Sequence, residues 1–368
     1  MKLSKLMLSA FVAAVALVSC NKEETTPIEK RLKTVEISLE NMMMTKSESA
    51  SIADQTKVQV NNFKIFLTDD SKQTVYVGKD ADGNEINPVF SAEQLATKAE
   101  FHFVDPKCTK VIVVANYGNT DITLADLSKK LDINLQQDET NLMLYAEQPL
   151  VDANRMHNDV LGDTTYEAPV YTANLTLVPR VARFEVNGFN VGFDENNPEY
   201  QNITFTQLAF QNYYPETTLN TGVETGDLVN HMANLLDQAS TFGWLNGTKA
   251  DNWYWDSFEA VCTPAQPVAE IEDLAYHMFA NTTAPTLVLK LSADGQPAYL
   301  YSKKFVGTDG KDIAEFKEGH IYRMNATSTA GGDGDIPVNP DAIDPVDRCL
   351  EITVDVTPWT VVLVRPEF

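Results

Sequence analysis

The sequence has few cysteines, and none of them lies in a pattern that carries chemistry. The four are Cys20, Cys108, Cys262 and Cys349, and no CxxC pair of the kind used in zinc or redox sites is present. Cys20 ends a secretory signal, which leaves three. Because three is an odd number, a disulfide framework is not expected, and we interpret these cysteines as small buried residues.

Catalytic motifs are also lacking. The sequence contains no Ser-His-Asp elbow, no HExxH and no phosphate-binding glycine loop, and its five histidines show no metal-ligand spacing. Acidic pairs such as Asp69-Asp70 and Glu23-Glu24 fall in an expected turn and a tether, so we do not interpret them as glycosidase carboxylates. We expect no enzymatic activity, no cofactor and no metal.

Basic residues are scarce. Lys and Arg number 28 against 52 Asp and Glu, which gives a net charge of −24. Such a charge repels nucleic acid and anionic membrane surfaces, so nucleic acid is not an expected partner. The 43% hydrophobic content excludes a disordered chain, and 368 residues suffice for two domains with separate cores.

The chain begins with a secretory signal, Met1 to Ser19, in which Lys2 and Lys5 precede an apolar segment too short to span a bilayer. This signal ends in Leu-Val-Ser-Cys20, which resembles the lipobox of bacterial lipoproteins. The resemblance implies that Cys20 receives a diacylglyceryl group, and more than one acyl chain gives stable anchoring. The alternative is an ordinary signal with an incidental cysteine. The following polar residues, 21–31, are expected to be a tether.

Thr34 to Glu40 alternates apolar and polar residues, which predicts a half-buried strand with Val35, Ile37 and Leu39 on its inner face. A polar, small-residue segment, Thr45 to Ser51, follows this strand and is expected to be exposed to proteases. Lys46 is the basic residue within it and is the predicted cleavage site. Arg31 is the second candidate, although a cut there leaves the strand attached.

Short alternating or apolar segments separated by turn residues continue through the body of the chain, and one of them, Val58 to Leu67, is expected to be a single strand. The apolar run Val111 to Val114 is suited to a central strand, and Asp294-Gly295 predicts a turn between two strands. Three short helices are expected, at Ala92–Thr97, Ile122–Leu131 and Leu228–Leu236. This pattern predicts an all-β fold of two β-sandwich domains in tandem with few short helices.

The C-terminal residues 350–368 alternate in the same way until Pro358, where the phase changes and the pattern becomes that of a strand buried on both faces. A Gly-, Pro- and Asp-rich linker precedes them and is expected to leave this tail free of its own domain, which should fold without it. We predict a donor strand, given to another molecule. Its apolar residues are Leu350, Ile352, Val354, Val356, Trp359, Val361 and Leu363.

The expected division of the chain follows from these segments. It is a signal peptide (1–19), a lipidated tether with a removable first strand (20–46), an N-terminal sandwich (47–179), a C-terminal sandwich (180–328), a linker (329–349) and the tail (350–368).

Several motifs, in order along essentially the whole chain, resemble the type V pilins, or fimbrillins, of anaerobic Gram-negative bacteria. They are the lipobox, the first strand with its basic site, Val113-Val114-Ala115-Asn116, Arg180-Val181-Ala182-Arg183, Gly319-His320-Ile321-Tyr322, and Val354 to Trp359. The resemblance implies transthyretin-like sandwiches and an outer-membrane lipoprotein precursor that matures into a surface fimbria. It also implies that a protease removes the first strand, and that a neighbour's C-terminal strand fills the vacated groove. Best-studied members are cut after arginine, whereas Lys46 occupies that position here.

Two function classes follow. In the first, the protein is a fibre subunit of the stalk, whose partners are further copies of itself, accessory tip and anchor pilins, and a trypsin-like or Lys/Arg-specific extracellular protease. In the second, it is a monomeric outer-membrane lipoprotein that binds glycans through the aromatic segment Trp244–Phe258, which includes Trp253, Tyr254 and Trp255. The apolar tail favours the first class, because a monomer would lose solubility through it.

Overall fold

A computed structural model describes most of the chain. The described residues are 31–40, 42–46, 57–60, 62–91, 99–117, 122–136, 142–161, 163–193, 200–222, 224–225, 228, 254–307, 311–324, 329–330, 349–358 and 360–365. The expected all-β fold is confirmed, since these residues form strands joined by turns and two short 3-10 helices, η3 (Leu124–Ser128) and η4 (Ile133–Gln136). Within them no helix has the length and apolar character needed to cross a membrane.

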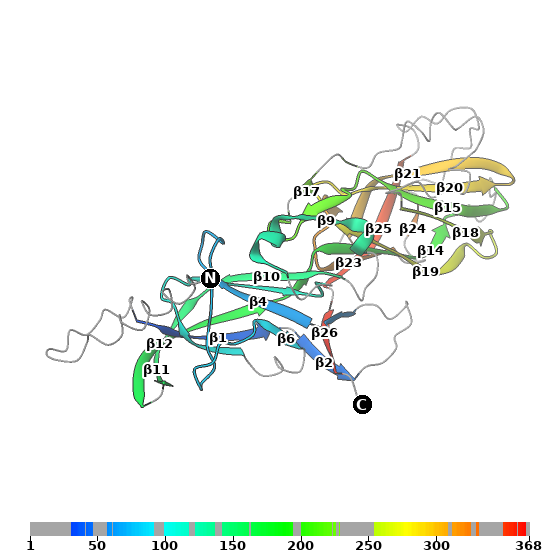
Figure 1. Cartoon of the computed structure of the whole chain (residues 1–368). Helices are drawn as coiled ribbons and strands as arrows, with labels where there is room; N and C mark the ends of the chain where they lie inside the picture. Colours follow the sequence, from blue (N-terminus) through cyan, green and yellow to red (C-terminus); the bar gives the residue numbers. More distant parts are fainter. Residues whose placement is uncertain are drawn as a thin grey trace, which may run out of the picture.

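Most of the strands before Arg180 form two sheets (Figure 1). One has the order β11-β12-β1-β7. The other has the order β13-β10-β8-β4-β5, with β6 also paired to β4. Their bounds are β1 (Lys33–Glu40), β4 (Asn62–Thr68), β5 (Val75–Tyr76), β6 (Val89–Ser91), β7 (Ala99–Val104), β8 (Lys110–Ala115), β10 (Leu144–Pro149), β11 (Val151–Leu161), β12 (Thr164–Thr176) and β13 (Val178–Pro179). The apolar run in β8 is central, as predicted, with β10 on one side and β4 on the other.

Most of the strands after Arg180 form a larger sheet in the order β18-β15-β20-β21-β25-β23-β14-β19, with β22 also paired to β21 and β24 to β14. Their bounds are β14 (Val181–Val191), β15 (Ile203–Gln211), β18 (Tyr254–Cys262), β19 (Val268–Phe279), β20 (Thr286–Ala293), β21 (Gln296–Gly307), β22 (Asp312–Ile313), β23 (His320–Met324), β24 (Thr329–Ala330) and β25 (Cys349–Pro358). The predicted turn joins β20 to β21, and both of its residues, Asp294 and Gly295, have positive φ, 47° and 85°.

The C-terminal tail is not free of its own domain, contrary to the expectation drawn from the linker. Its first part, β25, runs parallel to β21, with Ile352 opposite Phe305, and then antiparallel to β23, with Val356 opposite Tyr322. Its second part, β26 (Thr360–Arg365), lies between β2 (Met42–Lys46) and β3 (Lys57–Val60), parallel to both (Figure 1). The strands on either side of the tail have edges with backbone N–H and C=O groups that need partners. The tail supplies these partners from within the same chain.

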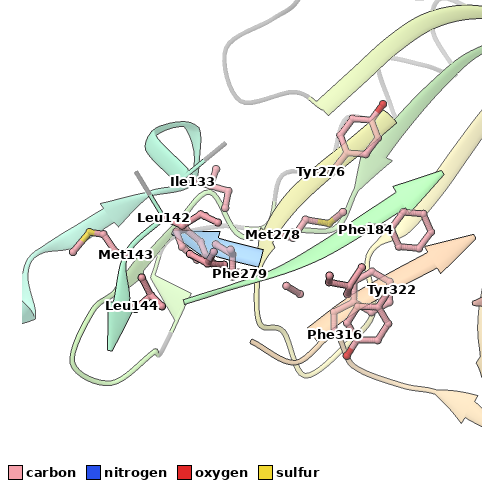
Figure 2. Packing of buried hydrophobic residues seen from close by; sticks show 14 of the residues in the cluster. Ile133, Leu142, Met143, Leu144, Phe184, Tyr276, Met278, Phe279, Phe316 and Tyr322 are labelled. Atoms are coloured by element: carbon pink, nitrogen blue, oxygen red, sulfur yellow. The ribbon is translucent and has the colours of Figure 1, made fainter. Parts of the chain in front are cut away.

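The two halves of the molecule are joined by shared structure. A small sheet has the order β17 (Glu224–Thr225), β16 (Glu216–Thr218) and β9 (Lys130–Asp132), so it combines strands from both halves. The imidazole Nδ1 of His277, on β19, lies 2.6 Å from the backbone carbonyl oxygen of Gln136, in η4. Figure 2 shows part of the buried core around this junction, which is continuous across both halves.

Two local expectations need correction. The segment expected as a helix over Ile122–Leu131 is a 3-10 turn capped by Thr123, whose backbone N–H and hydroxyl both donate to the Asp126 carboxylate; β9 follows it directly. The segment from Val58 to Leu67, expected as one strand, is divided into β3 and β4, which belong to different sheets. The helix expected at Ala92–Thr97 lies outside the described residues, and so does the helix expected at Leu228–Leu236 apart from Leu228 itself.

Candidate functional site

The predicted removable strand, β1, is an interior strand of its sheet. It runs parallel to β12, with register from Thr34 opposite Val170 to Glu40 opposite Thr176, and antiparallel to β7 on its other side. Both edges of β1 are therefore used by ladder hydrogen bonds. In the described sheets β1 is not paired with β2, so the two are not a hairpin.

The inner face of β1 is part of the hydrophobic core. Val35 and Ile37 are each 0% exposed, and Leu39 is partly buried against the same cluster. A fully buried side chain of this size contributes about 1.5–3 kcal/mol through removal of apolar surface from water. The alternation in the sequence correctly identified this face.

The outer face of β1 is covered as well, so the expectation of a half-buried strand was incomplete. Thr34 is 0% exposed and its hydroxyl donates to Asp159 Oδ2 at 2.9 Å, while Glu36 is 7% exposed and forms an ion pair with Arg155. Both partners belong to β11, whose register against β12 shifts between Asp152 and Met156. Thr34 and Glu36 are thus buried polar residues whose partners come from β11.

A third contact is made by Lys33 at the start of β1. Its ammonium group donates to the backbone carbonyl of Cys108 and lies 4.4 Å from the centre of the Tyr171 ring. Burial lowers the pKa of Lys33, and burial raises the pKa of the Cys108 thiol to about 11. Cys108 and Cys262 are free and buried, as the sequence predicted, while the side chain of Cys349 lies outside the described residues.

The two candidate cleavage sites lie on either side of β1. Arg31 precedes the strand, and its guanidinium forms an ion pair with Glu167 at 3.3 Å. Lys46 is the last residue of β2, opposite Arg365 of β26. Thr45 and Lys46 are therefore strand residues rather than part of an unstructured segment, and 47–51 lie outside the described residues. Lys46 remains the predicted site, because a cut after it separates both β1 and β2 from the body.

The predicted donor residues divide between two strands. Those up to Val356 lie on β25, whereas Val361 and Leu363 lie on β26, opposite Met42 and Met44 of β2. The break between the strands coincides with the change of phase at Pro358. Trp359 lies outside the described residues, and so does the lipidation candidate Cys20. The assignment of this tail as a donor strand stays a prediction.

The aromatic segment offered as a glycan site is only partly described. Trp244 and Trp253 lie outside the described residues, and Tyr254 and Trp255 are placed only by their backbone in β18. Phe258 is partly buried and stacks on the core residue Phe189, with ring centroids 5.7 Å apart and an interplanar angle of 12°. Core packing explains Phe258, so the described part of this segment does not favour a glycan site.

Sequence reasoning missed the residues that hold β1 from outside. Asp159, His102, His157 and Arg155 are far from β1 in the chain and lie in no motif. Only the tertiary structure brings Asp159 and Arg155 of β11 to Thr34 and Glu36, and places His102 of β7 and His157 of β11 against Asp159.

Comparison with known proteins identifies the fold. No family model matches the chain, and no curated protein matches it. Among solved structures, the fimbrilin FimA of Porphyromonas gingivalis covers 91% of this chain and 99% of its own at 11% identity, with a TM-score of 0.50. Two solved structures of proteins assigned to cell adhesion are also similar. The one from Bacteroides eggerthii has 13% identity, covers 91% of this chain and 98% of its own, and gives a TM-score of 0.45. The one from Parabacteroides distasonis has 12% identity, covers 91% of this chain and 99% of its own, and gives a TM-score of 0.46.

The chain therefore has a fimbrilin-like all-β fold. This confirms the fold that the sequence motifs implied. At 11% identity the similarity defines architecture alone, so function has to be argued from the site.

Proposed function

We propose that this protein is the precursor of a stalk subunit of a cell-surface fimbria, and that subunits join by strand exchange. The observation that carries the proposal is the interior position of β1, which is the first described strand yet has ladder partners on both sides. A cut after Lys46 would separate this strand from the body of the chain. Its departure opens a slot between β7 and β12 in which a strand from another molecule fits.

The slot left by β1 would bind another strand strongly. Removal of Val35 and Ile37 uncovers apolar core surface, and the facing edges of β7 and β12 lose their hydrogen-bond partners. An added strand restores both, because main-chain hydrogen bonds give affinity and alternate side chains give specificity. The tail offers apolar residues at alternate positions, so it is a suitable donor.

The position of β26 supports a link between cleavage and release of the tail. Residues 20–46 contain β1, which fills the slot, and also β2, which pairs with β26 from Met42 opposite Val361 to Lys46 opposite Arg365. A single cut after Lys46 would thus empty the acceptor and also free one edge of the donor. Before the cut, β1 and β2 are covalently attached to the subunit, so each has an effective concentration of about millimolar at its own binding position. A strand from another molecule rarely displaces them, and the precursor therefore stays monomeric.

The remaining parts of the proposal concern location and partners. Cys20 would anchor the precursor in the outer membrane through its lipid, and a Lys/Arg-specific extracellular protease would release residues 47–368 into the fibre. We propose the stalk because the chain has a removable first strand and also a tail, so each subunit can accept and donate. Accessory tip and anchor pilins would then end the fibre.

The direct test is polymerisation in vitro. Purified precursor is incubated with a lysine-specific protease, and the products are followed by mass spectrometry, by SDS-resistant ladders on unheated gels and by electron microscopy. Precursor without protease is the control. We expect ladders and fibres only after loss of residues 20–46. Complete cleavage after Lys46 with a product that stays monomeric would refute the proposal.

A further inference from the structure

A compact group of metal-binding side chains lies on the outer face of the β1 sheet. The Nδ1 atom of His102 is 2.7 Å from Asp159 Oδ1, and the Nδ1 atom of His157 is 2.6 Å from the same oxygen. One ligand atom from each of the three residues lies within 4.8 Å of the others. The Asp159 side chain is 1% exposed and that of His102 is 8% exposed, so the group is a built interior feature.

The three side chains come from opposite sides of β1. His102 lies on β7, which is paired with β1, and His157 and Asp159 lie on β11, which is separated from β1 by β12 in the sheet order. Thr34 of β1 lies between them and donates its hydroxyl to Asp159. The group therefore spans β1, and an ion bound by all three side chains would link β7 to β11 across that strand.

We propose that His102, His157 and Asp159 form a Zn²⁺ site. Two imidazole nitrogens and one carboxylate oxygen are a ligand set that zinc accepts, with bonds of about 2.0–2.2 Å and a fourth position left for water. Ligand atoms around a tetrahedral zinc ion lie about 3.3 Å apart. The nitrogen–oxygen distances of 2.6 and 2.7 Å need to open by well under 1 Å to reach this arrangement. The ligand atoms of the two histidines lie within 4.8 Å of each other, so they need to adjust by about 1.5 Å or less.

Two further features suit a metal. The Nε2 atom of His102 is 4.0 Å from Glu100 Oε1, so an approach of about 1 Å would let this carboxylate accept the ring N–H and orient a metal-bound histidine. The His157 side chain is 40% exposed, so an ion and its water ligand have a path from solvent. The Thr34 hydroxyl would hold the second oxygen of Asp159.

A metal at this site fastens β1. With zinc bound, β11 is held against β7 across the start of the strand, which adds a restraint to the hydrogen bond between Thr34 and Asp159. Loss of β1 removes that hydroxyl and changes the surroundings of Asp159. Zinc binding by the precursor, however, does not depend on strand exchange.

The test is titration of the metal-free precursor with ZnCl₂ by isothermal calorimetry, with the melting temperature as a second readout. We expect one zinc ion per chain with a micromolar or tighter Kd, and a higher melting temperature that excess EDTA reverses. His157→Ala is the test variant, because this exposed side chain is removable without a buried cavity. His320→Ala is the matched control, because His320 lies on β23 with its Nδ1 atom 2.9 Å from the Glu318 carbonyl oxygen.

We expect His157→Ala to weaken zinc binding at least tenfold and His320→Ala to leave it unchanged. Asp159→Asn, which keeps the shape of the side chain, is a second test variant and should also weaken binding at least tenfold. Absence of binding by the wild-type precursor overturns the proposal. So does a less than tenfold difference between His157→Ala and His320→Ala.

Discussion

The Lys33 ammonium group on β1 donates a hydrogen bond to the backbone carbonyl of Cys108, a residue that is 0% exposed. This contact ties the first strand to the turn that precedes β8. Because the Cys108 thiol is buried and burial raises its pKa to about 11, it is a weak nucleophile while β1 is in place.

Cys108 should therefore report the departure of β1. We expect the thiol to be unreactive toward a disulfide reagent in the precursor, and to react at least tenfold faster in cleaved monomeric subunits, before a donor strand fills the slot. The measurement is labelling followed by mass spectrometry in a Cys349→Ser background. Cys262 is an internal control, since it is buried in β18 and should stay unreactive. Equal labelling of both cysteines after cleavage would show general unfolding instead.

Ile37→Ala should destabilise the precursor. Ile37 is fully buried in β1, so the substitution leaves a cavity and should lower the free energy of unfolding by about 2–5 kcal/mol. Urea unfolding followed by circular dichroism measures the effect. Leu32→Ala is the control, because Leu32 is 45% exposed and precedes the strand, and we expect a change within about 0.5 kcal/mol. Similar values for both variants would mean that β1 contributes little to the core.

Processing should depend on Lys46 and be indifferent to Arg31. Lys46→Gln is expected to leave the full precursor mass at the cell surface and to abolish the SDS-resistant ladder. Arg31→Gln should leave both unchanged, because a cut at Arg31 retains all of β1. The N-terminal sequence of assembled protein decides the site, and we expect it to begin at Ser47. Assembled subunits that begin at Leu32 would contradict this prediction.

Two deletions of different length should distinguish the role of β26 from that of β25. Deletion of residues 360–368 removes β26 but keeps β25 between β21 and β23, so we expect a folded, cleavable subunit that forms no ladder. Deletion of 350–368 also removes β25 and leaves both neighbours with open edges, so it should destabilise the C-terminal half. Gel ladders and circular dichroism measure the two effects. A normal ladder from the shorter deletion would exclude β26 from the join.

Glu147 should make stability depend on acid pH. Partial burial acts to raise its pKa, but hydrogen bonds from Lys110, Lys72 and Tyr145 outweigh this effect and lower the pKa to about 2, from an ordinary value of 4.5. A lowered folded-state pKa gives stability that is fully present above pH 4.5 and is lost as the pH falls toward 2.

Glu147→Gln should therefore lower stability at neutral pH by about 1 kcal/mol, since the group is partly solvated, and should flatten the profile between pH 4.5 and 2. Melting temperature against pH measures this change. Glu167→Gln is the control, with a carboxylate that is 63% exposed. An unchanged acid profile in Glu147→Gln would contradict the assignment.

The sequence by itself determined the fold class and several of the strands. The alternation of residues 34–40 identified β1 and its inner face, the apolar run in β8 identified a central strand, and Asp294-Gly295 identified a turn. These features depend on local backbone preference and on side-chain periodicity, which are properties of neighbouring residues. The change of phase at Pro358 likewise marked the break between β25 and β26.

Only the tertiary structure decided which strands are partners. The tail was expected to be free, yet it pairs with β21 and β23 and then with β2 and β3, because open strand edges accept any strand that the chain can bring to them. The group of His102, His157 and Asp159 has no signal in the sequence for the same reason. Its members come from β7 and β11, and contacts between strands that are distant in sequence depend on chain topology, which residue spacing does not record.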